Sequence, residues 1–235
     1  MCHDEIALNG WTSTPANPAL IFGNKPYINA PTPIPLSKID FPSTDPIVSQ
    51  TLDYVTSILP RETLNHSMRV YHYGKIIQTQ QFPTSPLQST TWALACLLHD
   101  IGTAPSLLTS THMSFDLFGG IKALSVLTSF GCPTDVAEAV AEAIIRHQDL
   151  GVDGNITFLG QLIQLATIYD NVGEHPQMKD LGGWEINTRW KREGWSGVFA
   201  GVIREEVGVK PWCHSTHVVG FEGLVRGNML LREWE

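Results

Sequence analysis

From Pro46 onward, the apolar residues of this sequence recur at intervals of three and four positions. This spacing places them on one face of an α-helix, whereas a half-buried strand would need strict alternation, which no segment shows convincingly. The pattern predicts shorter helical pieces after Trp184 and Gly220, and longer helices over 46–59, 62–82, 88–100, 115–130, 134–148, 157–173 and 195–207. We therefore expect an all-α fold, a bundle of helices around a shared core.

The beginning of the chain has a different composition. The first 46 residues hold eight of the 15 prolines. Proline fixes φ and lacks a backbone donor, so this segment should be extended or irregular. It also carries apolar side chains, among them Trp11, Phe22 and Tyr27, that can lie on the helices. The sequence predicts a proline-rich N-terminal arm over 1–45, packed on a helical catalytic domain over 46–235.

The charge balance excludes some classes of partner. The formal net charge is -8 and no run of five basic residues occurs. Binding to a phosphate backbone needs clustered lysine and arginine, so we expect no nucleic-acid partner. No apolar stretch reaches the roughly 20 residues that cross a bilayer, and no apolar leader follows Met1. We expect an intracellular, cytoplasmic protein without a membrane partner, and the sequence leaves a homo-oligomer open.

Four of the predicted helices carry a histidine or an aspartate where an apolar residue is expected. The stripes are His66 with Val70, Tyr73 and Ile77, His147 with Val136, Val140 and Ile144, and Asp170 with Leu159, Ile163 and Ala166. His99 and Asp100 end a helix that is apolar on every side. Each residue alone also fits a hydrogen-bonded core histidine, or an aspartate turned to solvent at a helix end.

One shared metal ion accounts for all of these residues together, because an unpaired buried carboxylate costs several kcal/mol. Imidazole and carboxylate ligands suit zinc, iron or manganese. His99 and Asp100 point about 100° apart on a helix, but they can share an ion that lies off the helix axis near its end. We expect the ligands to be His66, His99, Asp100 and Asp170, with His147 further out or in contact with the substrate.

The order His … His-Asp … Asp resembles the HD-domain superfamily of metal-dependent hydrolases, which is all-α. Longer motifs make the chain similar to the fungal cyanamide hydratases over about 45–217. These motifs are Asn65-His66-Ser67-Met68-Arg69-Val70, Cys96-Leu-Leu-His99-Asp100-Ile-Gly102-Thr103, Met113-Ser-Phe-Asp-Leu-Phe-Gly119-Gly120-Ile121, Ala143-Ile-Ile-Arg146-His147-Gln-Asp149, Asn155-Ile-Thr-Phe-Leu-Gly160-Gln-Leu-Ile, Asp170-Asn171-Val172-Gly173 and Lys210-Pro-Trp-Cys-His214. Carried over position by position, the superfamily motif places metal ligands on His66, His99, Asp100 and Asp170.

The resemblance implies hydration of cyanamide to urea at one divalent ion, expected to be Zn²⁺, with Fe²⁺ and Mn²⁺ as alternatives. Zinc lowers the pKa of a bound water from roughly 15.7 to about 7, so metal-bound hydroxide is available at neutral pH to attack the nitrile carbon. Asp100 or His147 can then carry the proton to nitrogen. We favour Asp100, because one oxygen can ligate while the other takes the proton. Thr167 and Asn171 flank Asp170 and are expected to hydrogen-bond the substrate amine.

Two other interpretations use the same residues. An HD-type phosphohydrolase acting on a nucleotide or phosphate monoester would need positive partners, and Arg69 and Arg146 lie beside the candidate histidines. Arg146, however, falls on the polar face of its helix. A purely structural metal site is disfavoured because such sites are usually closed and rich in cysteine. Cys213, His214 and His217 supply only three of four zinc ligands, so we interpret them as no metal site.

Overall fold

The structure, a computed structural model, describes residues 6–173 and 183–235. Its helices are α2 Pro18–Phe22, α3 Pro46–Ile58, α4 Arg61–Gln81, α5 Ser89–Leu98, α6 Pro105–Leu108, α7 Phe115–Ser129, α8 Thr134–Ile145, α9 Phe158–Asn171, α10 Gly183–Arg189, α11 Trp195–Val209 and α12 Phe221–Arg226. Short 3-10 helices lie at η1 Leu36–Lys38, η2 Ile101–Thr103, η4 His214–His217 and η5 Arg232–Trp234. The all-α prediction is confirmed, and each long helix lies where the apolar spacing placed it.

Local sequence explains where the helices begin. The Asp45 side chain accepts hydrogen bonds from the backbone N–H groups of Ile47 and Val48, and Pro46 occupies the first helical turn of α3. Thr157 caps α9 in the same way by accepting from the Gly160 N–H. Short polar side chains at this position satisfy donors that have no partner within the helix.

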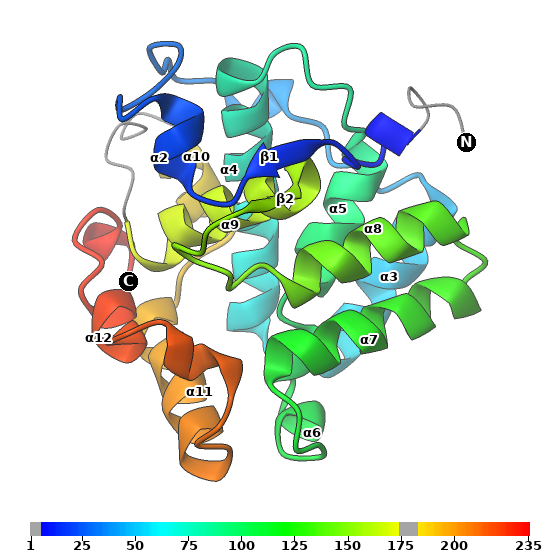
Figure 1. Ribbon diagram of the computed structural model, residues 1–235, viewed down its shortest axis with the longest axis vertical. Helices are drawn as coiled ribbons and strands as arrows, with labels where there is room; N and C mark the ends of the chain where they lie inside the picture. The colour runs from blue at the N-terminus through cyan, green and yellow to red at the C-terminus, as the bar shows by residue number, and fades with distance from the viewer. Residues whose placement is uncertain (1–5, 174–182) are drawn as a thin grey trace.

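The helices α4, α5 and α9 form the centre of the molecule, as Figure 1 shows. Every side chain of α5 from Thr91 to Leu98 is buried, in agreement with its apolar sequence. The helices α3, α7 and α8 lie on one side of this centre, and α11 with α12 lies at the other end (Figure 1). Polar residues on α4, α5 and α9 therefore meet inside the protein.

A short strand pair was not predicted from the sequence. β1 (Ser13–Pro15) pairs antiparallel with β2 (Asn155–Thr157), so the N-terminal arm is tied to the chain just before α9. Three-residue strands are too short to show an alternating pattern, and their pairing depends on segments far apart in the chain. Trp11 adds a second tie, because its Nε1 donates to the Asp135 carbonyl oxygen 3.0 Å away. The division of the chain at residue 45 stays a prediction.

Gly120 on α7 and Gly102 in η2 allow α7 to lie close to α8 and to the segment that follows α5. A Cβ on Gly120 would lie 2.8 Å from the Ala141 carbonyl oxygen of α8 and closer still to Ile145. A Cβ on Gly102, two residues after Asp100, would clash with the Phe115 carbonyl oxygen. A larger residue at either position would push α7 away from its neighbours.

No helix within residues 6–173 and 183–235 is both long enough and apolar enough to cross a membrane. The predictions of a cytoplasmic location, of no nucleic-acid partner and of an open oligomeric state stay predictions.

The helix α4 contains a second buried histidine, His72, in addition to His66. Neither ring nitrogen has a hydrogen-bond partner among the described residues, and the ring stacks on Trp190 at a centroid distance of 4.2 Å. Burial, followed by the charge of Arg189, lowers the pKa of His72 from 6.5 to about 3. In the folded protein His72 is therefore neutral over most of the acidic range.

We predict that His72 makes the protein sensitive to acid. The unfolded chain binds a proton near pH 6.5 and the folded protein only near 3, so stability is full above 6.5 and is lost as pH falls between these values. Each pH unit of separation corresponds to about 1.4 kcal/mol. His72→Phe, which keeps the stacked ring, should reduce the fall in unfolding free energy between pH 7 and pH 4, measured by urea denaturation. An equal fall in both proteins would contradict this account.

Candidate metal centre

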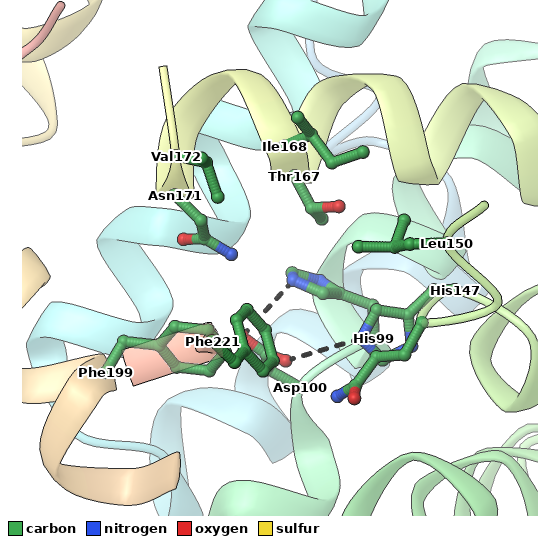
Figure 2. Close-up of a pocket in the computed structure, with 11 residues that line it drawn as sticks. His99, Asp100, His147, Leu150, Thr167, Ile168, Asn171, Val172, Phe199 and Phe221 are labelled. Carbon is green, nitrogen blue, oxygen red and sulfur yellow. Dashed lines mark ion pairs between the residues drawn. The ribbon is translucent and has the colours of Figure 1, made fainter. Parts of the chain in front are cut away.

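Four elements bring the five sequence-predicted residues into one region. His66 lies on α4, His99 and Asp100 follow the last turn of α5, His147 follows α8, and Asp170 lies on α9. All five side chains are buried. Figure 2 shows His99, Asp100 and His147 beneath α9, with Thr167 and Asn171 pointing toward them from that helix.

Three of these residues point their ligand atoms at one another. In the part of the chain that the structure describes, His66, His99 and Asp100 form the one group whose possible ligand atoms all lie within 4.8 Å of each other. The Nε2 atoms of His66 and His99 are 3.1 Å apart. Asp100 Oδ2 lies 3.3 Å from His99 Nε2 and 3.6 Å from His66 Nε2.

The outer hydrogen bonds of the two histidines determine which nitrogen carries the proton. His99 Nδ1 lies 2.8 Å from the Cys96 carbonyl oxygen, and His66 Nδ1 lies 2.6 Å from Asp170 Oδ2. Both partners only accept, so each Nδ1 must donate. If both rings are neutral, the two Nε2 atoms present bare lone pairs to each other, an arrangement that a proton or a metal cation between them relieves. Histidines that bind metals commonly donate their other N–H in this way.

The buried carboxylate of Asp100 adds a negative charge beside the two histidine nitrogens, which further favours a cation at this place. Neither of its carboxylate oxygens has a hydrogen-bond partner among the described residues, although both are buried. Burial alone would raise the pKa of Asp100, but the neighbouring His99, His66 and His147 outweigh burial and hold it well below its usual range. A buried, ionised and unpartnered carboxylate beside two bare nitrogens fits a bound divalent cation.

The pKa of His66 is lowered from its ordinary value, whereas the pKa of His99 is raised. Burial lowers the pKa of His66 to about 4 and outweighs the opposing effect of Asp170. Burial also opposes protonation of His99, yet Asp100, the Cys96 carbonyl oxygen and Asp170 together outweigh burial and raise the pKa of His99. The point between these residues therefore attracts a positive charge even inside the apolar core.

Asp170 lies behind His66, away from this point. Its Oδ2 contacts His66 Nδ1 and lies 2.8 Å from Arg69 Nη2, and its Oδ1 lies 2.9 Å from both Arg69 Nε and Arg192 Nη1. Its backbone oxygen accepts from Arg192 and from the Asn228 amide. Burial alone would raise the pKa of Asp170, but Arg69 and Arg192 outweigh burial and lower it strongly.

These contacts use the lone pairs with which Asp170 would bind a metal. In the structure the residue orients His66 and neutralises two buried arginines. The ligand role of Asp170 stays a prediction, whereas His66, His99 and Asp100 already converge.

His147 lies on the opposite side of Asp100. Its Nδ1 donates to the Ile144 carbonyl oxygen 2.6 Å away, because that oxygen only accepts. Its Nε2 is 3.9 Å from Asp100 Oδ1. Burial and the nearby His99 lower the pKa of His147, so its Nε2 is a free base at neutral pH. This geometry suits a proton acceptor beside the cluster.

A small cavity adjoins Asp100. It is lined by His99, Asp100, His147, Gln148, Leu150, Thr167, Ile168, Asn171, Val172, Phe199 and Phe221. The volume that the centre of a water-sized molecule can occupy is about 20 Å³. Such a volume exceeds the roughly 10–15 Å³ that one water requires, so the cavity suits a ligand of very few atoms.

Thr167 and Asn171 present different hydrogen-bonding groups to this cavity. The Thr167 hydroxyl donates to the backbone oxygens of Ile163 and Gln164, which leaves its own oxygen as an acceptor. Asn171 Oδ1 accepts from Trp195 Nε1 at 2.7 Å, which leaves the Asn171 NH₂ group as a donor. One residue can therefore accept from a ligand and the other can donate to it.

Among the residues that the structure describes, no arginine or lysine lines the cavity. Arg69 donates to Asp170 and to the backbone oxygens of Trp190 and Lys191. Arg146 pairs with Asp149 on the partly exposed face of its segment, at 2.7 Å. The two cations that a phosphate ester would require are therefore both committed elsewhere.

Several residues of the site carried no usable sequence signal. Trp195 stacks on the His66 ring at 4.3 Å, and Phe199 stacks on Trp195 at 5.1 Å. Phe221 meets Phe199 edge to face at 5.8 Å. Aromatic residues are ordinary core residues, so their type alone does not indicate a site. Arg69, one turn after His66, was a usable signal, because an arginine beside a buried histidine can pair with a buried carboxylate as well as with a phosphate.

The cluster of Cys213, His214 and His217 has other partners. His214 Nδ1 contacts Asp116 Oδ2 at 2.5 Å, and its pKa is raised by that hydrogen bond. His217 Nε2 lies 3.0 Å from the Leu150 carbonyl oxygen. Within the described ranges, these three residues do not form a group with metal-ligand spacing.

Comparisons with known proteins agree with this geometry. The HD domain family model matches residues 63–172, a range that contains all five predicted site residues. Two relatives from Saccharomyces cerevisiae, cyanamide hydratase DDI2 and cyanamide hydratase DDI3, are each 38% identical to this chain over 193 residues. The alignment covers 81% of this chain and 84% of each relative. Trp195, Phe199 and Phe221 lie outside the HD match.

We predict that Asp170→Asn destabilises the protein strongly, because it leaves Arg69 buried without a counter-charge and takes from Arg192 one of its two carboxylate partners, the other being Glu235. Removing one partner of a buried ion pair typically costs about 3–5 kcal/mol. Urea denaturation followed by circular dichroism measures this loss. Glu222→Gln removes an exposed carboxylate that also pairs with two arginines, Arg204 and Arg226, and should change stability little. Equal effects of the two substitutions would refute the structural role of Asp170.

Proposed function

We propose that this chain, which belongs to the HD-domain family of the yeast cyanamide hydratases, adds water to cyanamide to give urea. One observation carries the proposal: His66, His99 and Asp100 point unpaired ligand atoms at one place, beside a cavity of about 20 Å³. Cyanamide is neutral and has only three non-hydrogen atoms, so it suits a cavity of this size. The reaction adds the water oxygen to the nitrile carbon and moves protons to the nitrile nitrogen.

We propose that His66, His99 and Asp100 hold one divalent cation, with zinc preferred and iron(II) or manganese(II) as alternatives. The donor set of two imidazole nitrogens and one carboxylate suits all three ions. Asp170 is proposed to support His66 from behind, either alone or with a ligand role of its own. When bound, the cation lowers the pKa of a water molecule and so supplies hydroxide near neutral pH.

Asn171 and Thr167 are proposed to orient the substrate. The free Asn171 NH₂ group can donate to the nitrile nitrogen, which becomes more basic as the carbon is attacked. The Thr167 oxygen can accept from the substrate amine. From the sequence, both residues were expected to bind the substrate amine. The Asn171 NH₂ group and the amine N–H groups are all donors, so we now assign Asn171 to the nitrile nitrogen and only Thr167 to the amine.

Asp100 and His147 are proposed to move the protons. Asp100 turns Oδ2 toward the two histidines, while its Oδ1 lies 3.9 Å from His147 Nε2. One carboxylate oxygen can therefore face the cation while the other exchanges a proton with His147 through one bridging water, because 3.9 Å is too long for a direct hydrogen bond. Both groups are unprotonated at neutral pH, as a base that receives a proton from water requires.

The alternative of a phosphohydrolase has less support. A nucleotide or phosphate monoester needs positive partners and a larger volume, and the cavity as lined by the described residues offers neither. Arg69 and Arg146, which the alternative requires, bind other groups.

The purified, zinc-loaded protein should produce urea from cyanamide and should not release phosphate from nucleoside monophosphates. His147→Gln should lower kcat by roughly 10²–10⁴-fold, because it removes a proton carrier. His112→Gln replaces an exposed histidine and serves as the matched control. Colorimetric urea and phosphate assays measure both reactions. Phosphate release without urea formation would overturn the proposal in favour of the alternative.

Elemental analysis should find about one divalent metal per chain, with zinc bound in preference to iron or manganese. His66→Ala, His99→Ala and Asp100→Ala should each lose this metal, while His147→Ala should retain it. Asp170→Asn separates the two roles of that residue, provided that circular dichroism shows a folded chain. Retained metal indicates that Asp170 only orients His66, and lost metal indicates a ligand. A His99→Ala variant with unchanged metal content would refute the ligand assignment.

A further inference from the structure

We propose that four apolar side chains form a constriction that selects small, neutral molecules before they reach Asp100. The four residues are Leu150, Ile168, Val172 and Phe221, called the gate below. This inference rests on the proposed function, because it concerns how cyanamide would enter and what would be kept out.

The gate separates two spaces of very different size. The inner cavity beside Asp100 and His147 has a volume of about 20 Å³. A second, outer pocket of about 280 Å³ lies between the N-terminal arm, α9 and α12, and Ala19 and Leu224 are among the residues that line it. All four gate residues line both spaces, so they form the wall that the two spaces share. Figure 2 shows the gate side chains around the inner cavity.

The chemistry of the outer pocket favours neutral molecules. Within residues 6–173 and 183–235, none of the residues that line it is charged. The four gate side chains offer no hydrogen-bond partner, so an ion crossing them would lose hydration without compensation. A small neutral molecule crosses the same wall at little cost. The gate therefore rejects phosphate esters by charge and larger nitriles by size.

The gate residues come from three separate segments of the chain. Ile168 lies on α9 and Val172 is its C-cap residue, and both flank Asp170, which the buried arginines hold. Phe221 begins the short helix α12 directly after Gly220, whose φ of 72° lies in the left-handed region that glycine adopts readily. Leu150 lies between α8 and β2, and its carbonyl oxygen contacts His217. Phe221 and Leu150 thus supply the part of the gate that does not belong to the α9 segment.

Aromatic contacts couple the gate to the ligand cluster. Phe221 packs on Phe199, Phe199 stacks on Trp195, and Trp195 stacks on His66. Phe199 lines only the inner cavity, so the series runs from the gate along the cavity wall to a proposed ligand. The position of Phe221 is consequently determined by the same packing that holds His66.

The test compares two neutral substrates that differ in bulk, cyanamide and dimethylcyanamide. Phe221→Ala and Leu150→Ala should each raise the ratio of kcat/KM for dimethylcyanamide to that for cyanamide by about tenfold or more, because a few methyl groups in a tight apolar pocket discriminate by this amount. Leu224→Ala, which removes an apolar side chain of the outer pocket alone, should leave the ratio unchanged. Phe221→Leu is the milder replacement if Phe221→Ala does not fold.

A second measurement does not depend on activity. Methyl NMR of the zinc-loaded protein can follow Thr167, which lines only the inner cavity, and Leu224, which lines only the outer pocket. In the wild type, acetonitrile should shift both methyl signals, and the bulkier trimethylacetonitrile should shift Leu224 alone. In Phe221→Ala, both nitriles should shift Thr167.

The outcomes separate the gate from the reaction. The gate proposal would be overturned if trimethylacetonitrile shifted the Thr167 methyl signal in the wild type. It would also be overturned if, in folded Phe221→Ala and Leu150→Ala, this signal did not respond to trimethylacetonitrile and the kcat/KM ratio of the two substrates stayed unchanged. If the NMR pattern is as expected but no urea forms, the gate stands and the proposed function fails.

Discussion

The buried carboxylate of Asp170 is the interaction on which the rest of the site depends. It joins α4 through His66 and Arg69 to the segment before α11 through Arg192, and its backbone oxygen reaches Asn228 near the C-terminus. A carboxylate without such partners would be too costly to bury, and so would the two arginines. Satisfied together, they fix the His66 ring so that its Nε2 faces His99. The orientation of a proposed metal ligand thus follows from an ion-pair network that lies behind it.

The chemistry in front of His66 is unusual for a protein core. Two bare imidazole nitrogens and an unpartnered carboxylate face one point, and a third free imidazole, that of His147, stands on the far side of the carboxylate. Folding brings these groups together at a cost, because lone pairs and a negative charge are gathered in a medium that solvates them poorly. A divalent cation offsets this cost, so we expect metal binding to contribute to the stability of the fold as well as to the reaction.

The two parts of the chain contribute differently to the site. The range that matches the HD domain supplies the proposed ligands and proton carriers, and the region after it supplies Arg192, Trp195, Phe199 and Phe221. The N-terminal arm closes the outer pocket from another side. A common ligand set can serve several reactions. What enters the cavity is determined by its aromatic and aliphatic walls, which explains how a general metal core can be restricted to a very small substrate.

The sequence by itself determined the helices and the polar residues that are buried among them. The three-to-four spacing of apolar residues identified each long helix, and the same spacing placed His66, His147 and Asp170 on buried faces, because the period of an α-helix assigns every residue to a face. Only the tertiary structure decided what these residues contact. Asp170 meets two arginines, of which Arg192 is 22 positions away in the chain and without periodic signal, and β1 pairs with β2 across most of the chain. The shared wall of Leu150, Ile168, Val172 and Phe221 also joins distant segments. Helical period fixes the direction of a side chain from its own helix, but the identity of its partner depends on how separate elements pack.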